Sequence, residues 1–238
     1  MEDRNYVNYV DERDLQASLA FPALMRKVYL WMTLALVITG ITAYGVATSP
    51  AALQFVLGNK IVFYGLIIAE FGLVLAISGM INRLSITTAT LFFVLYSVVN
   101  GATLSVVLLA YTQESVTQVF FITAGTFAAM SAVGFLTKRD LSSVGRILFM
   151  ALIGLIIATV VNIFWKNSGF MAILNYLGVL IFVGLTAYDT QKIKNMLLTA
   201  EDGGEVGQKM ALLGALTLYL DFINLFLYLL RILGKARD

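Results

Sequence analysis

The stretch that decides the fold runs from Lys209 to Leu233, KMALLGALTLYLDFINLFLYLLRIL. It is long and apolar enough to cross a membrane, since a helical span needs roughly 20 mostly apolar residues to cover about 30 Å of hydrocarbon. Asp221 lies near its centre. A carboxylate is unfavourable there unless it has a partner or faces water, so an ionisable group inside a span indicates a candidate functional site.

The polar residues of this stretch repeat at helical spacing. Residues three or four apart lie along one stripe of a helix, and here they are Gly214, Thr217, Asp221, Asn224, Tyr228 and Arg231. A polar stripe on a helix in lipid must face protein or water, so we expect this helix to lie in the middle of a bundle. Interhelical hydrogen bonding is the simpler role for Thr217 and Asn224, but that role does not need the ionisable side chain of Asp221.

The rest of the chain is equally apolar. Of its 238 residues, 60% are hydrophobic and 13% are charged, whereas soluble proteins are about one quarter charged. The apolar stretches predict an all-α membrane protein with seven spans, at about 28–48, 61–81, 86–111, 119–136, 147–164, 171–192 and 210–233. Short connections favour one transmembrane domain over residues 28–238. Residues 1–27 are expected to form a polar N-terminal tail, with a short interfacial helix over Leu15–Lys27.

The distribution of Lys and Arg predicts the orientation of the spans. Basic residues are more numerous at the ends that include Lys138 and Lys192, which puts the N-terminus in the cytoplasm and the C-terminus outside. The basic residues Arg231, Lys235 and Arg237 near the C-terminus leave open a topology in which the last segment bends back.

The chain has no histidine and no cysteine. A disulfide framework, a thiolate metal site and a cysteine nucleophile are therefore excluded, and so are the pH sensing and zinc binding that histidine provides. No G-x-S-x-G motif is present, so we expect no enzymatic activity and no bound cofactor. The net charge of +2 and the lack of a basic patch argue against nucleic-acid binding. Proton-linked behaviour near neutral pH must then come from carboxylates.

A second acid, Asp189, lies near the end of the sixth predicted span. It can pair locally with Lys192 or Lys194, or with Asp221 on the last span. Helix counting puts Asp189 roughly 27 Å from the outer side and Asp221 roughly 18 Å from the cytoplasmic side, if the last helix starts near Met210. The two acids meet only if that helix begins outside the hydrocarbon or if water reaches inward from the cytoplasm.

Glu70 is a third acid, near the middle of the second predicted span. No base lies at helical spacing from it, so its partner must come from another helix. Arg83, at the end of the same span, is either a counter-ion for the aspartates or an ordinary basic anchor at the membrane surface. Asn100 in the third span is expected to make packing hydrogen bonds.

Two segments resemble the Bax inhibitor-1 (transmembrane Bax inhibitor motif) family. They are residues 182–194, FVGLTAYDTQKIK, and residues 218–226, LYLDFINLF, and the resemblance extends over all seven spans. It implies seven helices with the last in the middle of the other six. It also implies a pH-sensitive calcium-leak protein of the bacterial inner membrane, in which Asp189 and Asp221 share a proton and gate the path. Glu70 falls on the family's second-helix acid, and Arg83 lies about two residues from the register of its arginine.

The predicted function is passive, pH-modulated calcium permeation across the lipid bilayer. Two close carboxylates titrate as a coupled pair, and a pair that has lost its shared proton can separate or capture calcium, which prefers oxygen ligands. Asp189 and Asp221 are thus also a candidate calcium site. The alternative is a non-transporting interaction protein that modulates a membrane protease or a stress response. A proton-coupled transporter is a third option, although no inverted repeat supports it.

Overall fold

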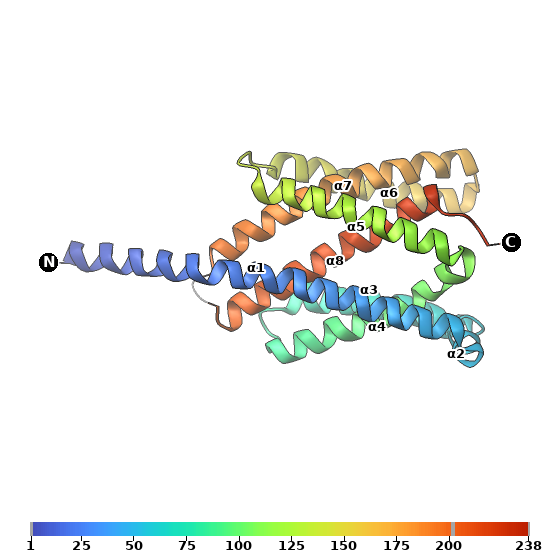
Figure 1. The fold of residues 1–238 in the computed structure, drawn as a ribbon, viewed down its shortest axis with the longest axis horizontal. Coiled ribbons are helices and arrows are strands. Elements are labelled where there is room, and N and C mark those ends of the chain that lie inside the picture. Colours follow the sequence, from blue (N-terminus) through green and yellow to red (C-terminus); the bar gives the residue numbers. More distant parts are fainter. Residues whose placement is uncertain (1, 201–202, 238) are drawn as a thin grey trace. The chain divides into compact units, whose positions relative to one another are not determined.

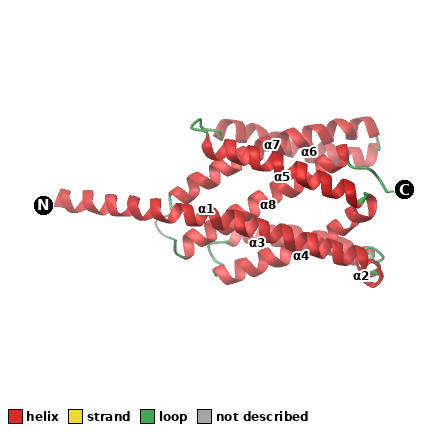
Figure 2. Ribbon diagram, in the orientation of Figure 1, coloured by secondary structure: helices red, strands yellow, loops and turns green. Residues whose placement is uncertain are grey.

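The computed structural model describes the backbone of residues 2–200 and 203–237, with side chains from residue 20 onward. Helices make up nearly all of this part of the chain, and no element in it is a strand (Figure 2). The helices, labelled in Figure 1, are α1 (Glu2–Thr48), α2 (Pro50–Val56), α3 (Lys60–Met80), α4 (Ile86–Ala110), α5 (Gln113–Leu136), α6 (Ser142–Trp165), α7 (Ser168–Leu198) and α8 (Glu205–Leu233).

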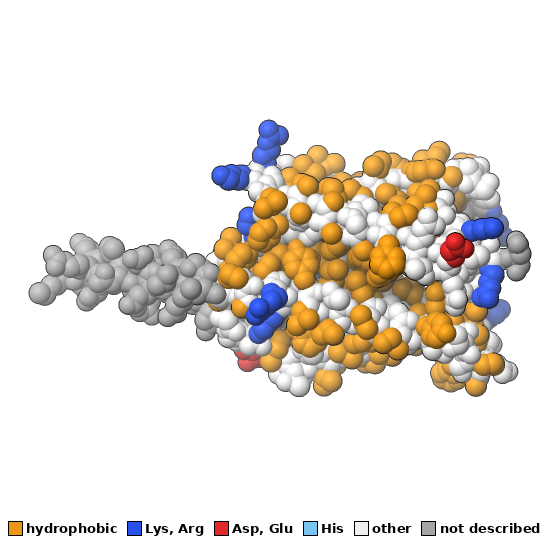
Figure 3. Space-filling model, in the orientation of Figure 1, with side chains coloured by type: hydrophobic (Ala, Val, Ile, Leu, Met, Phe, Trp, Pro, Cys, Tyr) orange, Lys and Arg blue, Asp and Glu red, His pale blue; other side chains and the backbone are white. Residues whose placement is uncertain are grey.

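Seven of these helices, all except α2, are long and apolar enough to cross a membrane. Their outer faces carry exposed large hydrophobic side chains such as Ile68, Phe71 and Leu75 on α3. Hydrophobic side chains cover much of the visible helical surface, and Lys and Arg gather near helix ends (Figure 3). The prediction of an all-α membrane protein with seven spans is confirmed.

The last span is the most buried. In the most apolar 18-residue stretch of α8, 67% of the residues are buried. The corresponding share is 44% in α7, the next most buried span, and 6% in α3. A helix with side chains buried on nearly every face must have neighbours on every side, which agrees with the central position expected for the last helix.

The N-terminal helix is longer than the sequence predicted. α1 runs without a break from Glu2 to Thr48, so the backbone expected to form a tail and a separate interfacial helix continues directly into the first span. Residues 2–19 contain neither glycine nor proline, and nothing in them stops a helix. The side chains before residue 20 lie outside the described part of the chain.

The chain forms two compact units. The first is Met1–Val106 with Ile193–Thr217, and the second is Val107–Lys192 with Leu218–Asp238. The boundaries fall inside α7 and α8, so each of these helices contributes residues to both units.

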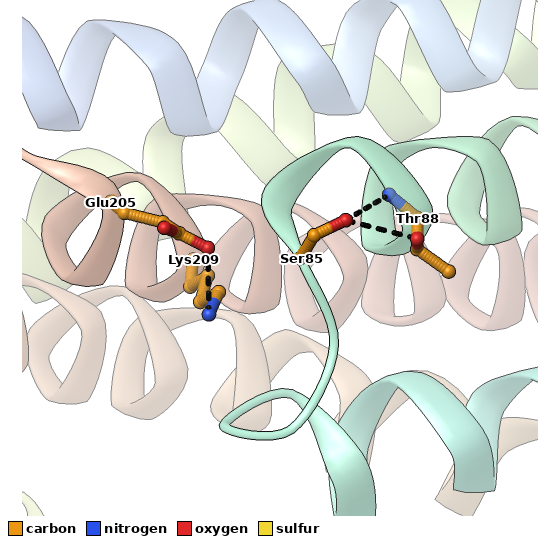
Figure 4. Close-up of polar contacts among 4 residues, drawn as sticks. All are labelled: Ser85, Thr88, Glu205 and Lys209. Carbon is orange, nitrogen blue, oxygen red and sulfur yellow. Dashed lines mark hydrogen bonds and ion pairs between the residues drawn. The ribbon is translucent and has the colours of Figure 1, made fainter.

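In the first unit, hydrogen bonds connect α4 to α1 and to the start of α8. The Thr39 hydroxyl donates to the Ser97 carbonyl at 3.0 Å, which joins α1 to α4. Glu205 is the first residue of α8, and its carboxylate forms an ion pair with Lys209 at 2.9 Å (Figure 4). The same carboxylate also accepts the backbone N–H of Ile86 at the start of α4. Beside it, the Ser85 hydroxyl caps α4 by accepting the backbone N–H of Thr88 at 3.1 Å (Figure 4).

In the second unit, α6, α7 and α8 share an apolar core that includes Leu155, Phe182 and Leu225. The chain after α8 pairs with the connection between α4 and α5. The Thr112 N–H donates to the Lys235 carbonyl at 3.1 Å, and two further bonds join Arg237 to Ala110 and Lys235 to Ser115. The end of α8 is therefore fixed to the start of α5.

Candidate functional site

Asp189 and Asp221 are brought together in the second unit. Their carboxyl groups lie within hydrogen-bonding reach of each other, and the side chains are 9% and 5% exposed. A carboxylate only accepts hydrogen bonds, whereas a protonated carboxyl group can also donate one. A hydrogen bond between the two groups therefore requires at least one proton on the pair.

The lengths of α7 and α8 explain how the two acids meet. α8 begins at Glu205 rather than near Met210, and α7 continues to Leu198 rather than ending at Lys192. The predicted starting point of the last helix was therefore wrong by five residues, or about 7.5 Å at 1.5 Å per residue. A last helix that begins outside the hydrocarbon is one of the two conditions under which the sequence allowed the acids to meet, and the earlier start is in the direction of that condition.

The antiparallel register of α7 and α8 is visible in a second contact. Phe182 lies seven residues before Asp189, and Tyr228 lies seven residues after Asp221. Their rings stack with centroids 5.8 Å apart. Since two pairs seven residues apart follow the same antiparallel alignment, the contact between the acids belongs to a regular packing of the two helices.

One oxygen of Asp221 has no hydrogen-bond partner. Within the described part of the chain, Oδ2 of Asp221 is buried and makes no such bond. Buried polar atoms are nearly always paired, and an unpaired acceptor carries a desolvation penalty of about 1–3 kcal/mol. This oxygen is available to a proton donor or a cation.

Lys192 is the base that acts on the pair. It lies three residues after Asp189 on α7 and interacts electrostatically with both carboxyl groups. Its ammonium is 6.0 Å from the ring centroid of Tyr188. Lys192 thus lies within electrostatic reach of Asp189, and a local ion pair between the two stays a prediction. Arg83 is exposed in the connection after α3, in the first unit, and its role as a counter-ion stays a prediction.

The residues of α7 that follow Asp189 are bound to α5 and to the connection between α5 and α6. Gln191 is 7% exposed. Its Oε1 accepts the backbone N–H of Leu141 at 2.8 Å, and its Nε2 donates to the Arg139 carbonyl at 2.8 Å. The neighbouring Thr190 hydroxyl is 3.1 Å from the Ser131 hydroxyl on α5.

Two glycines allow α5 and α6 to approach the same segment closely. A Cβ on Gly134 would overlap the backbone carbonyl of Ala187, and a Cβ on Gly145 would overlap the ring of Tyr188. Small residues let helix backbones come close in membranes, where packing and hydrogen bonds replace the hydrophobic drive. No role was predicted from the sequence for the residues that make these contacts, which are Ser131, Gly134, Gly145, Thr190 and Gln191. The adjacent polar residues Thr190 and Gln191 were a signal of a buried polar contact, but not of its partner.

Glu70 has partners in the first unit, all on α4. The Thr103 hydroxyl donates to its carboxylate, and the Asn100 side chain is hydrogen-bonded to it. Tyr96, one turn before Asn100, interacts electrostatically with Glu70. The partner thus comes from another helix, as the sequence indicated. The role of Glu70 in an ion path stays a prediction.

The other polar residues of α8 bond to their own helix. The Thr217 hydroxyl donates to the Leu213 carbonyl at 3.0 Å, and the Asn224 amide donates to the Leu220 carbonyl at 2.8 Å. Both side chains are half-buried. These recorded bonds are not the interhelical bonds that the sequence suggested, and the supporting role of the two residues stays a prediction.

No group of three or more Asp, Glu, His or Cys side chains in the described part of the chain is placed to hold a metal ion. The aspartates offer two carboxyl groups, whereas calcium takes six to eight oxygen ligands. The pair alone is therefore suited to a brief contact with a cation rather than to tight binding.

Residues 22–238 match the family described as inhibitor of apoptosis-promoting Bax1. The chain is 49% identical over 215 residues to the inner membrane protein YbhL of Escherichia coli (strain K12), covering 90% of this chain and 92% of that protein. It is 44% identical over 218 residues to a protein of Rickettsia prowazekii, with 90% of each chain covered. A membrane protein of Streptococcus pyogenes serotype M6 is 40% identical over 183 residues, covering 77% of this chain and 79% of its own length.

Proposed function

Because the chain belongs to the Bax inhibitor-1 family of membrane proteins, we propose that it is a pH-sensitive calcium-leak channel of the bacterial inner membrane. The gate is the proton shared by Asp189 and Asp221, and the N-terminus lies in the cytoplasm. The observation that carries the proposal is the burial of these two carboxyl groups within hydrogen-bonding reach of each other, in a protein without histidine.

The closed state is the singly protonated pair. With one proton shared, the hydrogen bond holds α7 against α8 at the level of the two acids. Two unit charges 4 Å apart repel each other by about 4 kcal/mol at an effective dielectric constant of about 20. This energy is large enough for the loss of one proton to separate the helices.

The open state follows from loss of the proton as the pH rises. The two carboxylates then repel each other and attract a divalent cation, and the unpaired oxygen of Asp221 adds an acceptor at the same point. Calcium completes its coordination with water and backbone oxygens as it passes. Glu70 contributes negative charge elsewhere on the path. The leak therefore increases as the medium changes from mildly acidic to mildly alkaline.

The test is calcium flux into liposomes that contain the Asp221→Asn variant. An amide cannot ionise, so we expect the variant to lose the increase in flux between mildly acidic and mildly alkaline pH. If its rate and pH dependence equal those of the wild type, the gating role of the pair is wrong.

Asp140→Asn is the matched control. Asp140 is exposed before α6, and hydrogen bonds from the Ser142 side chain and backbone hold the pKa of its carboxyl below the ordinary value of 3.8. A group with a lowered pKa in the folded state loses its stabilising effect only as the pH falls through that pKa. Asp140 therefore stays ionised over the whole range of the flux measurement, and its variant should keep the wild-type profile.

The competing function is that of an interaction protein that modulates a membrane protease. No calcium flux from the purified wild-type protein, together with co-purification of a protease, would contradict the channel and favour this function.

A further inference from the structure

Gln191 completes the hydrogen bonding of a segment that is not helical. Residues 137–141 connect α5 to α6, and Leu141 precedes the first residue of α6 without a side-chain cap. Backbone groups at such a helix end need partners from elsewhere. The Gln191 amide supplies two, since it accepts the Leu141 N–H and donates to the Arg139 carbonyl. One buried side chain of α7 thus binds both a backbone donor and a backbone acceptor of this connection.

The residues on either side of Asp189 are also held. Ala187 lies against the Gly134 backbone of α5, Tyr188 against Gly145 of α6, and Thr190 is 3.1 Å from Ser131 of α5. The segment from Ala187 to Gln191 is therefore attached to α5, to the connection and to α6. The carboxyl group of Asp189 is the part of it that bonds to α8.

The partner segment of α8 is held differently. Thr217 and Asn224, one turn before and after Asp221, direct their recorded hydrogen bonds to their own helix. Phe222, beside Asp221, contacts the rings of Phe120 and Phe127 on α5, with centroids 5.5 Å away in each case.

We propose that Gln191 is a positioning residue: its two hydrogen bonds fix the α7 segment that carries Asp189 to the connection before α6, and so hold the Asp189 carboxyl group at Asp221. This inference rests on the proposed channel function. Gln191 acts through the backbone of the connection and does not touch a permeating ion.

The charged groups around this segment come from four parts of the chain. Asp221 on α8 and Lys192 on α7 act directly on Asp189. The connection and the first turns of α6 carry Lys138, Arg139, Asp140 and Arg146. Substituting Gln191 with Met removes both hydrogen bonds without adding or deleting a charge, so a changed pH profile reports on position rather than on a new electrostatic partner.

The first experiment compares calcium flux of Gln191→Met and the wild type in liposomes across the pH range. Without the two hydrogen bonds, Asp189 is no longer held at Asp221, and we expect the leak at mildly acidic pH to rise on the order of tenfold, with a flatter profile. Gln208→Met is the matched control. Gln208 also bonds to a connection, through Nε2 to the Gly203 carbonyl at 3.3 Å, and its variant should follow the wild-type profile.

The second experiment measures hydrogen exchange of the Leu141 amide, corrected for the intrinsic effect of pH. We expect protection in the wild type at both ends of the pH range and faster exchange in Gln191→Met. Loss of protection in the wild type in parallel with rising flux would show that α7 moves, and would overturn the inference. This measurement on the wild type decides the question even if the variant does not fold.

The outcomes separate the two proposals. If the wild type shows pH-dependent flux and Gln191→Met has the same profile, only the positioning role is overturned. If the wild type carries no flux at any pH, the channel function fails, and the role of Gln191 at the gate fails with it, even where the Leu141 amide remains protected.

Discussion

Asp189 and Asp221 are two ordinary carboxylic acids in an unusual setting. In water, both would be ionised at neutral pH, since an unperturbed aspartate has a pKa of about 3.9. In the folded protein, they are buried within hydrogen-bonding reach of each other. At the residue scale, the proposed gate therefore requires the folded state to retain a proton that the unfolded chain releases.

Asp189→Asn tests this retained proton through stability. Where the folded state binds more protons than the unfolded state, stability falls as the pH rises. We expect the wild-type melting temperature in detergent to decrease from neutral to alkaline pH, and Asp189→Asn to show a smaller decrease, because its amide can donate to Asp221 without a titrating proton. Parallel curves for the two proteins would show that the pair does not hold the proton.

At the scale of elements, α5 and the connection before α6 hold the stretch of α7 that carries Asp189. Glycine at 134 lets α5 reach the α7 backbone at Ala187, and Gln191 joins the same stretch of α7 to the connection before α6. α8 is bound to this group through the aspartate pair and through ring contacts such as Phe182 with Tyr228.

Gly134→Ala tests the close approach of α5 and α7. The added Cβ would overlap the Ala187 carbonyl, so the helices must shift apart, and overpacking of this kind lowers the free energy of unfolding by about 1–3 kcal/mol. Gly125→Ala is the control on the same helix, because a Cβ there meets nothing within 4 Å. Thermal unfolding in detergent measures both. Equal stability of the two variants would contradict the close packing.

The helices were predictable from sequence, and their ends were not. Hydropathy identifies the spans because it reports the length of chain that lipid surrounds. It does not report helix that continues beyond the lipid, which is why residues 2–14 of α1, 193–198 of α7 and 205–209 of α8 were not predicted as parts of these helices.

The site was predictable only in part. Asp221 stands out by its position in an apolar helix, but its partner came from a family resemblance, since helix counting left Asp189 at a different depth. The bond from Gln191 to Leu141 joins residues 50 positions apart. Neither residue is unusual in its local sequence, so this contact needed the three-dimensional structure.

At the scale of the whole molecule, the two compact units share α7 and α8, and each unit contains an acidic side chain with partners of its own, half-buried in the first unit and buried in the second. The first holds Glu70 against Asn100 and Thr103, and the second holds the aspartate pair. Any movement of α8 driven by the pair involves a helix that runs through both units. The proposed gate would therefore act on a helix that contributes residues to both units.

The most direct test of the shared-proton gate measures protonation and flux on the same liposomes. Infrared spectroscopy detects the C=O stretch of a protonated carboxyl group, and calcium entry is followed over the same pH series. We predict that a protonated-carboxyl band of the wild type disappears with the same midpoint at which the calcium leak increases, and that Asp221→Asn lacks this titrating band. A leak that increases while the band is unchanged, or the same titrating band in Asp221→Asn, would contradict the account.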